Sequence, residues 1–112
     1  STGKFKSNGI PVNSLLWRAS LDIIDFMPLS LIDVNGGFIS TDWYINSENN
    51  QVRFKVKISF SNPELRASSF KVSVIREKIK NGVWVSDGSS EGLARKLEDL
   101  ILTRARELRQ KK

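Results

Sequence analysis

The 112-residue chain contains neither cysteine nor histidine. Without cysteine it has no disulfide and no thiolate nucleophile or zinc ligand, and without histidine it has no imidazole base or imidazole metal ligand. No apolar run approaches the about 20 residues that a membrane-spanning helix needs. These absences exclude most mechanisms that small enzymes use, so we expect a domain without catalytic activity, metal or cofactor.

The composition is that of one small globular domain. Hydrophobic residues make up 39% and charged residues 27% of the chain, which supports one core and leaves no room for separate cofactor and substrate domains. We interpret residues 1–12 as a flexible leader or linker and residues 13–112 as a single α+β domain. Because the sequence begins with Ser1 and lacks an initiator methionine, we expect a mature or trimmed product of a longer precursor.

Positive charge is concentrated at the C-terminal end. Eighteen Lys and Arg residues against twelve Asp and Glu residues give a net charge of +6. The segment 93–112 alone contributes +4, because it holds seven basic and three acidic residues. A basic domain favours anionic partners, such as nucleic acid, anionic lipid headgroups or acidic protein surfaces.

Hydrophobic periodicity predicts a helix, four strands and a second helix. Asn13 or Ser14 is a good N-cap for a first helix that Pro28 ends after Met27. A second, long helix with an apolar stripe that includes Leu100 is predicted over about 91–109. The strands are expected at 38–45, 52–60, 70–79 and 83–85, with turns at 33–37 and at Asn81-Gly82.

The second predicted strand has the clearest alternation in the chain. Its apolar residues alternate with Arg53, Lys55 and Lys57, so one face belongs to the core and the other is basic and exposed. Such strands are typical of an antiparallel sheet covered on one side, not of a doubly wound parallel sheet. The phase of the third strand slips near Ile75, which predicts a β-bulge there or a strand whose second half changes face.

These elements predict an α+β fold with two layers. We expect an antiparallel four-stranded sheet that packs on the long C-terminal helix and is joined by the N-terminal helix, a helix-grip-like arrangement. In the first strand, strict alternation places Ile39, Thr41, Trp43 and Ile45 on one face and Phe38, Ser40, Asp42 and Tyr44 on the other.

The main candidate binding surface combines cations with aromatic residues. Arg53, Lys55 and Lys57 place three cations on the exposed sheet face, and Asp42 and Tyr44 on a neighbouring strand can complete a basic, aromatic platform for single-stranded RNA. The alternative is that these are ordinary exposed strand residues, with lysine discouraging edge pairing. Aromatic platforms normally show two or three exposed rings, whereas the phenylalanines of the strands are in phase with the core: Phe54, Phe60 and Phe70.

Trp43 and Tyr44 form a second candidate. Adjacent strand residues point to opposite faces, so one ring is buried while its neighbour lies under a helix or is exposed. Exposed aromatic rings mark binding sites more often than exposed aliphatic side chains do. Arg18 with Trp17 on the first helix, and Arg66 before the third strand, can join such a patch, and plain packing is the alternative for each residue.

Other chemistry has little support. The Asn35-Gly36-Gly37 segment lacks the lysine and the strand–loop–helix context of a phosphate-binding loop, so it is interpreted as a turn. Two pairs of carboxylates could serve acid–base catalysis, but both are better explained as solvated helix faces. These pairs are Asp22 with Asp25 and Glu98 with Asp99.

Several segments resemble a known family. LWRASLD (16–22), TDWY (41–44) and ILTRAREL (101–108), within a similarity that runs from about Leu15 to Arg109, resemble the alphaproteobacterial lipoproteins that carry an uncharacterised domain of unknown function. The resemblance implies a signal peptide and a lipidated cysteine upstream of Ser1, and so a membrane-anchored domain that faces the periplasm. No catalytic residues are established for the family, so none are carried over.

The predicted two-layer shape is also similar to the helix-grip domains of a lipoprotein of the outer-membrane β-barrel assembly machinery. This similarity implies a non-enzymatic scaffolding module that binds an envelope protein or the anionic membrane surface in outer-membrane assembly or maintenance. The alternative is a small RNA- or DNA-binding domain that uses the basic sheet face. A third class, an enzyme or a small-ligand carrier, stays open, and an apolar groove with a few polar groups would favour the carrier.

Overall fold

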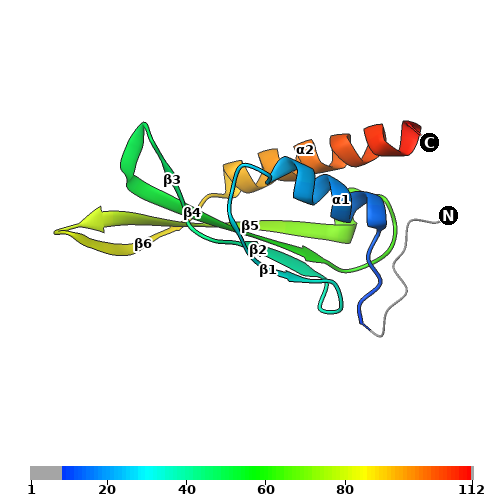
Figure 1. Cartoon of the computed structure of the whole chain (residues 1–112), viewed down its shortest axis with the longest axis horizontal. Helices are drawn as coiled ribbons and strands as arrows, with labels where there is room; N and C mark the ends of the chain where they lie inside the picture. Colours follow the sequence, from blue (N-terminus) through cyan, green and yellow to red (C-terminus); the bar gives the residue numbers. More distant parts are fainter. Residues whose placement is uncertain (1–8, 112) are drawn as a thin grey trace.

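The computed structural model describes residues 9–111. Both helices lie on one face of a single antiparallel sheet (Figure 1), so the predicted α+β class with a long C-terminal helix is confirmed. In chain order the elements are helix α1 (Ser14–Ile23), strands β1 (Leu29–Asp33), β2 (Phe38–Thr41), β3 (Tyr44–Asn46) and β4 (Asn49–Phe60), the 3-10 helix η1 (Ala67–Ser69), strands β5 (Phe70–Lys80) and β6 (Val83–Ser89), and helix α2 (Glu91–Gln110).

The sheet has six strands within residues 9–111, so the prediction of four strands is wrong. The strand order is β1-β2-β4-β5-β6, and β3 pairs with β4 beyond the end of β2. β1 was not predicted. It is an edge strand with four of its five residues exposed, so its sequence shows no alternation of apolar and polar residues. The predicted strand 38–45 is two strands, because the chain breaks pairing at Asp42 and Trp43.

This break reverses the phase of the strand. Ile39 before the break is fully buried against the helices. After the break, Tyr44 packs against the core, whereas Ile45 is 47% exposed and pairs with Arg53. Trp43 lies over the same arginine. The prediction that Trp43 and Ile45 share a face with Ile39 is therefore wrong, since Tyr44 takes the core side.

Helix α1 begins as predicted and ends early. The Asn13 side chain accepts hydrogen bonds from the N–H groups of Leu15 and Leu16, both at 3.0 Å. The helix ends at Ile23, four residues before the predicted end at Met27. Residues 24–27 form turns instead of a further helical turn. These turns still bury Met27, which is 5% exposed.

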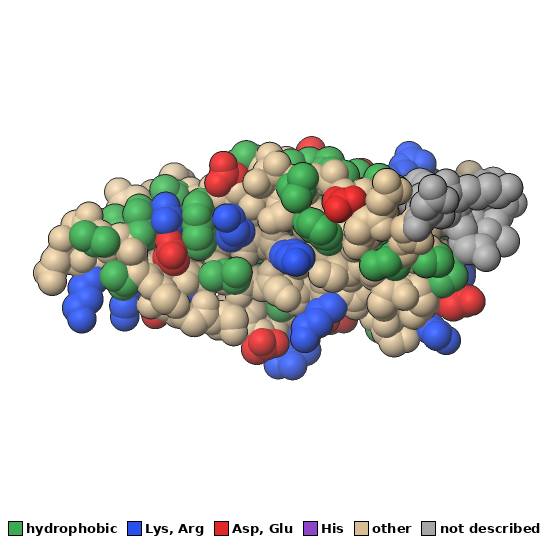
Figure 2. Space-filling model, turned by 90° about the horizontal axis from the view of Figure 1, so that it is seen from below, with side chains coloured by type: hydrophobic (Ala, Val, Ile, Leu, Met, Phe, Trp, Pro, Cys, Tyr) green, Lys and Arg blue, Asp and Glu red, His purple; other side chains and the backbone are tan. Residues whose placement is uncertain are grey.

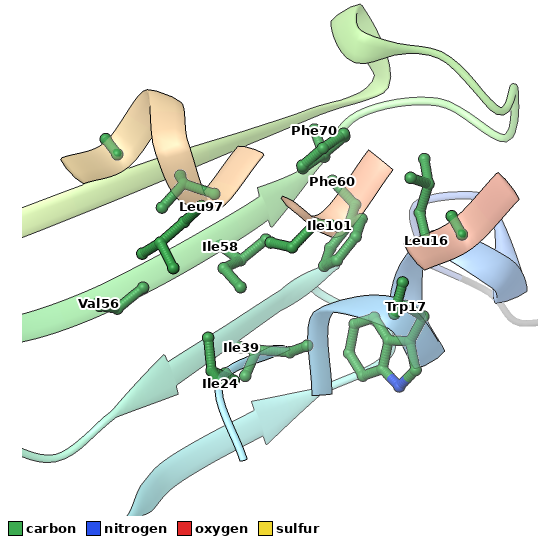
Figure 3. Packing of buried hydrophobic residues seen from close by; sticks show 14 of the residues in the cluster. Leu16, Trp17, Ile24, Ile39, Val56, Ile58, Phe60, Phe70, Leu97 and Ile101 are labelled. Atoms are coloured by element: carbon green, nitrogen blue, oxygen red, sulfur yellow. The ribbon is translucent and has the colours of Figure 1, made fainter. Parts of the chain in front are cut away.

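The core lies between the two helices and the face of the sheet that they cover, here called the inner face. Helix α2 matches its predicted span to within one residue, although Leu100, expected in its core-facing stripe, is 44% exposed. Figure 3 shows side chains of the sheet pointing toward those of the helices: Ile39, Val56, Ile58, Phe60 and Phe70 from the sheet, Leu16 and Trp17 from α1, and Leu97 and Ile101 from α2.

The β5–β6 hairpin turns at Asn81 and Gly82 as predicted. Both residues have positive φ, 51° and 79°, which is the backbone of a type I′ turn and matches the twist of the flanking strands. β6 extends to Ser89, beyond the predicted end at residue 85. The hairpin and the long β4 carry the sheet past the first turn of α2 (Figure 1).

A register shift lies at the predicted place near Ile75, but its extra residue is on β6, so the prediction of a bulge or a change of face in the third predicted strand is wrong. β5 keeps its alternation, with Val74 buried and Ile75 46% exposed. Register with β6 shifts between Ile75 and Glu77, so that Arg76 faces both Asp87 and Gly88. Gly88 has a φ of +75°, a conformation that glycine adopts at little cost. Pairing of β5 with β4 continues without a shift through the same positions.

The predicted leader lies largely outside the described residues. Within its described part, the N–H of Ile10 donates to the carbonyl of Asn35 at 3.0 Å, and Val12 is fully buried. The division into a leader and a domain stays a prediction.

Candidate functional site

The face of the sheet turned away from the helices, here called the outer face, has no covering layer among residues 9–111. Figure 2 looks onto this face and shows Lys and Arg side chains interleaved with hydrophobic ones along the molecule. β4 supplies cations to it, since its apolar residues alternate toward the core. The predicted basic face is therefore present.

A guanidinium group lies between two indole rings on the outer face. The Cζ atom of Arg53 is 4.3 Å from the centroid of Trp43 and 4.4 Å from that of Trp84. We call Trp43, Arg53 and Trp84 the tryptophan clamp. Glu77 on β5 accepts from Arg53 Nε at 2.8 Å and from Nη2 at 2.5 Å. Stacking and charge-assisted hydrogen bonds together hold both rings in a fixed arrangement.

Local backbone geometry positions the two tryptophans. Trp43 lies at the break between β2 and β3, where the carboxylate of Asp42 accepts from the Trp43 N–H at 2.8 Å. Asp42 thus stabilises the break itself. Trp84 follows the Asn81-Gly82 turn and pairs with β5 in the β5–β6 ladder. Sheet pairing then brings both rings beside the central strand that carries the arginine.

Two further cations lie over aromatic rings. Lys55 Nζ is 5.0 Å from the centroid of Trp43, and Lys57 Nζ is 4.7 Å from that of Phe38. Neither lysine has a carboxylate within ion-pair distance in the described part of the chain. Their charges are therefore available to an anionic partner, whereas the charge of Arg53 is compensated.

The remaining predicted binding residues lie elsewhere. Tyr44 is on the inner face, where its ring packs edge-on against Phe26 with 5.2 Å between centroids. Arg18 is exposed on α1, in the helical layer, and Arg66 is exposed in the loop before η1. Of the predicted residues, the structure brings four together on the outer face with Asp42 beside them: Trp43, Arg53, Lys55 and Lys57.

Sequence reasoning missed Trp84 and Phe38. Both are aromatic residues of the outer face that contact its cations. For Phe38 a signal was present, because strand alternation places it on the face opposite to the buried Ile39. Trp84 follows the hairpin turn by two residues, but its contact with Arg53 depends on register across three strands, for which a single sequence gives no signal.

One member of each candidate carboxylate pair makes a contact between elements of the fold. Asp22 accepts a hydrogen bond from Arg104 Nε at 3.0 Å, and this bond raises the pKa of the Arg104 guanidinium. Glu98 accepts from the backbone N–H of Val72 at 2.8 Å and so joins α2 to β5. Residues 9–111 contain no cluster of three or more side chains able to hold a metal ion, and no helix among them is long and apolar enough to span a membrane.

Comparison with known sequences defines the family. Residues 10–110 match the family described as a domain of unknown function (DUF3576). The chain belongs to this family. The DUF3576 domain is 40% identical over 103 residues to the uncharacterized protein RP420 of Rickettsia prowazekii (strain Madrid E). That match covers 92% of the present chain and 62% of the relative, so the chain spans less than two thirds of the relative's length.

No solved structure matches the DUF3576 domain significantly. The predicted membership in an alphaproteobacterial family defined by a domain of unknown function is confirmed at this level by the family match and the rickettsial relative.

Proposed function

We propose that this DUF3576 domain is a non-enzymatic binding module that docks an acidic surface of another envelope protein on its outer face. The observation that carries the proposal is the tryptophan clamp with Lys55 and Lys57 beside it. Tryptophan and arginine are enriched at the energetic centres of protein interfaces. Rings that are already fixed lose little conformational entropy when a partner covers them.

The charges of the outer face favour an acidic partner. Glu77 compensates Arg53, which leaves the two lysines of β4 uncompensated. Alternate residues of a strand are about 6.5–7 Å apart. An extended acidic segment places alternate carboxylates at the same spacing, so it can meet both lysines while its apolar side chains cover the indoles.

The cellular location is part of the proposal. We infer that a lipidated cysteine upstream of Ser1 anchors the domain on the periplasmic side of a membrane, on the basis of the family resemblance. A net charge of +6 suits this location, because each basic residue near an anionic membrane contributes about 1 kcal/mol. A role in outer-membrane assembly or maintenance rests on the helix-grip-like arrangement, which is a fold-level analogy.

The test is affinity purification of the full-length protein from its native cells after mild crosslinking. The test variant is Lys55→Glu with Lys57→Glu, and the matched control is Arg18→Glu with Arg66→Glu, which makes the same change of charge away from the outer face. We expect wild type and control to enrich the same envelope protein and the test variant to lose it. Equal enrichment by all three proteins, or equal loss in both variants, would contradict docking on the outer face.

Single-stranded nucleic acid is the second candidate. One observation favours it: three aromatic rings, each half-buried, lie beside the cations of the outer face, from Phe38, Trp43 and Trp84. Rings and cations on a sheet face form the usual platform for single-stranded RNA. Fluorescence anisotropy with a labelled oligonucleotide decides between the two candidates. Tight binding at physiological salt that weakens steeply as salt rises would favour nucleic acid.

A further inference from the structure

A pocket lies on the inner face, away from the tryptophan clamp. It has a volume of about 200 Å³ and lies between the β3–β4 hairpin, the segment after α1 and the first turns of α2. Its wall is almost entirely apolar and includes Phe26, Met27, Tyr44, Phe54, Leu93 and Leu97. An apolar cavity of about 150 Å³ is enough to take up benzene from water, so this pocket has room for a short hydrocarbon segment.

Positive charge flanks the pocket. The Cζ atom of Arg76 lies 5.4 Å from the centroid of Phe54, a ring that lines the pocket. Arg76 and Lys78 share one carboxylate, with 3.3 Å from Arg76 Nε and 3.7 Å from Lys78 Nζ to oxygens of Asp87. Two cations with one carboxylate leave one positive charge uncompensated at this place.

These ion pairs are open to competition. Both distances exceed the about 2.7–2.9 Å of a good charge-assisted hydrogen bond. The side chains of Arg76 and Lys78 are 36% and 51% exposed, so an anion from solution can reach them. Asp87 lies at the register shift of β6, and its single negative charge compensates only one of the two cations.

Phe26 marks the open side of the pocket. Its side chain is 58% exposed although it lines an apolar cavity. Its ring packs edge-on against Tyr44, at an interplanar angle of 89°. A hydrocarbon chain in the pocket would cover part of this exposed ring, and burial of apolar surface drives such binding.

We propose that this pocket binds a single-chain amphiphile with an anionic headgroup. The hydrocarbon chain enters between Phe26, Phe54 and Leu97, and the headgroup lies against Arg76. The site is on the opposite face from the proposed protein-docking surface and adds a small-ligand function to the domain.

The test is an NMR titration of the ¹⁵N-labelled chain with decanoate below its critical micelle concentration. Decyltrimethylammonium, which has the same chain length and the opposite charge, is the matched ligand control. We expect saturable shifts at the amides of Leu93, Leu97 and Phe54 with decanoate, and at least about tenfold weaker binding of the cation. Absence of saturable shifts, shifts outside the pocket, or equal affinity for both ligands would overturn the proposal.

Two variants separate the charge from the cavity. Arg76→Gln should weaken decanoate binding about five- to tenfold and leave binding of uncharged decanol unchanged. Leu93→Trp should fill the pocket and abolish binding of both, with an unchanged dispersion of the remaining amide signals. Lys55→Glu with Lys57→Glu should bind decanoate like wild type, so failure of the outer-face proposal and failure of this one are distinguishable. Equal loss of decanol and decanoate in Arg76→Gln would contradict the headgroup contact.

Discussion

The side-chain hydroxyl of Thr41 accepts a hydrogen bond from the backbone N–H of Val56 at 2.9 Å. Both residues are buried, at 0% and 2% exposure. The bond lies where the neighbour of β4 changes from β2 to β3, a point at which the ladder pairs Val56 with neither strand. The hydroxyl therefore replaces a backbone acceptor, and it supports the break that turns Trp43 to the outer face.

Thr41→Val tests this replacement. Valine has nearly the same shape but no acceptor, so the N–H of Val56 becomes buried without a partner. We expect the free energy of unfolding to fall by about 1–3 kcal/mol, measured by urea denaturation. Thr41→Ser keeps the hydroxyl and should lose only about 0.8 kcal/mol for the missing methyl group. A smaller loss for valine than for serine would contradict the role of the hydroxyl.

Arg53→Lys tests the tryptophan clamp. Lysine keeps the charge but lacks the planar group that stacks between the rings and binds Glu77 through two nitrogens. We expect about 1 kcal/mol lower stability and greater quenching of tryptophan fluorescence by acrylamide, because Trp43 and Trp84 become more accessible. Arg18→Lys, at an exposed helical position, should change neither quantity. Unchanged quenching in the Arg53 variant would show that the rings hold their arrangement without the guanidinium.

Two glycine substitutions should change stability in opposite directions. Gly82 has a φ of +79°, and Gly92 lies in the first turn of α2; a Cβ atom at either position meets nothing within 4 Å. Gly82→Ala should cost about 1 kcal/mol, because an L side chain is strained at positive φ. Gly92→Ala should add about 0.5–1 kcal/mol by favouring the helix. Thermal unfolding of both variants checks the signs, and the same sign for both would contradict this account.

Adjacent residues of α2 should respond very differently to truncation. Ile101 is fully buried and Leu100 is 44% exposed. Ile101→Ala should lower the free energy of unfolding by about 2–5 kcal/mol, because it leaves a cavity in the core. Leu100→Ala should cost less than about 1 kcal/mol. Urea denaturation of the pair measures the difference, and similar losses would place Leu100 in the core as the sequence pattern had suggested.

Much of the fold follows from local patterns. The alternation of β4, the apolar stripe of α2, the Asn13 cap and the Asn81-Gly82 turn each depend on residues close in sequence, and each is present in the structure. Two features depend on distant residues instead. β1 takes its place only because β2 offers it a ladder, and the break after Thr41 depends on Val56.

The candidate site divides in the same way. The position of Lys55 and Lys57 on the outer face followed from strand alternation alone. Trp84 lies beside Arg53 only because β4, β5 and β6 pair in this register. Tyr44 lies on the inner face instead of the outer face, because the break after Thr41 reverses which residues of the strand face the core. Local sequence therefore predicted the cations, while tertiary pairing selected their aromatic partners.

The length of β4 has a consequence for local unfolding of the sheet. One of its edges pairs with β5 from Val52 to Phe60 without interruption. Its other edge is divided between β2 and β3. Amide hydrogens of β4 that point to β5 should therefore exchange with solvent in one cooperative event. Amide hydrogens of β4 that point the other way should fall into two groups with different protection from exchange, because β3 can separate from β4 while β2 stays paired with it.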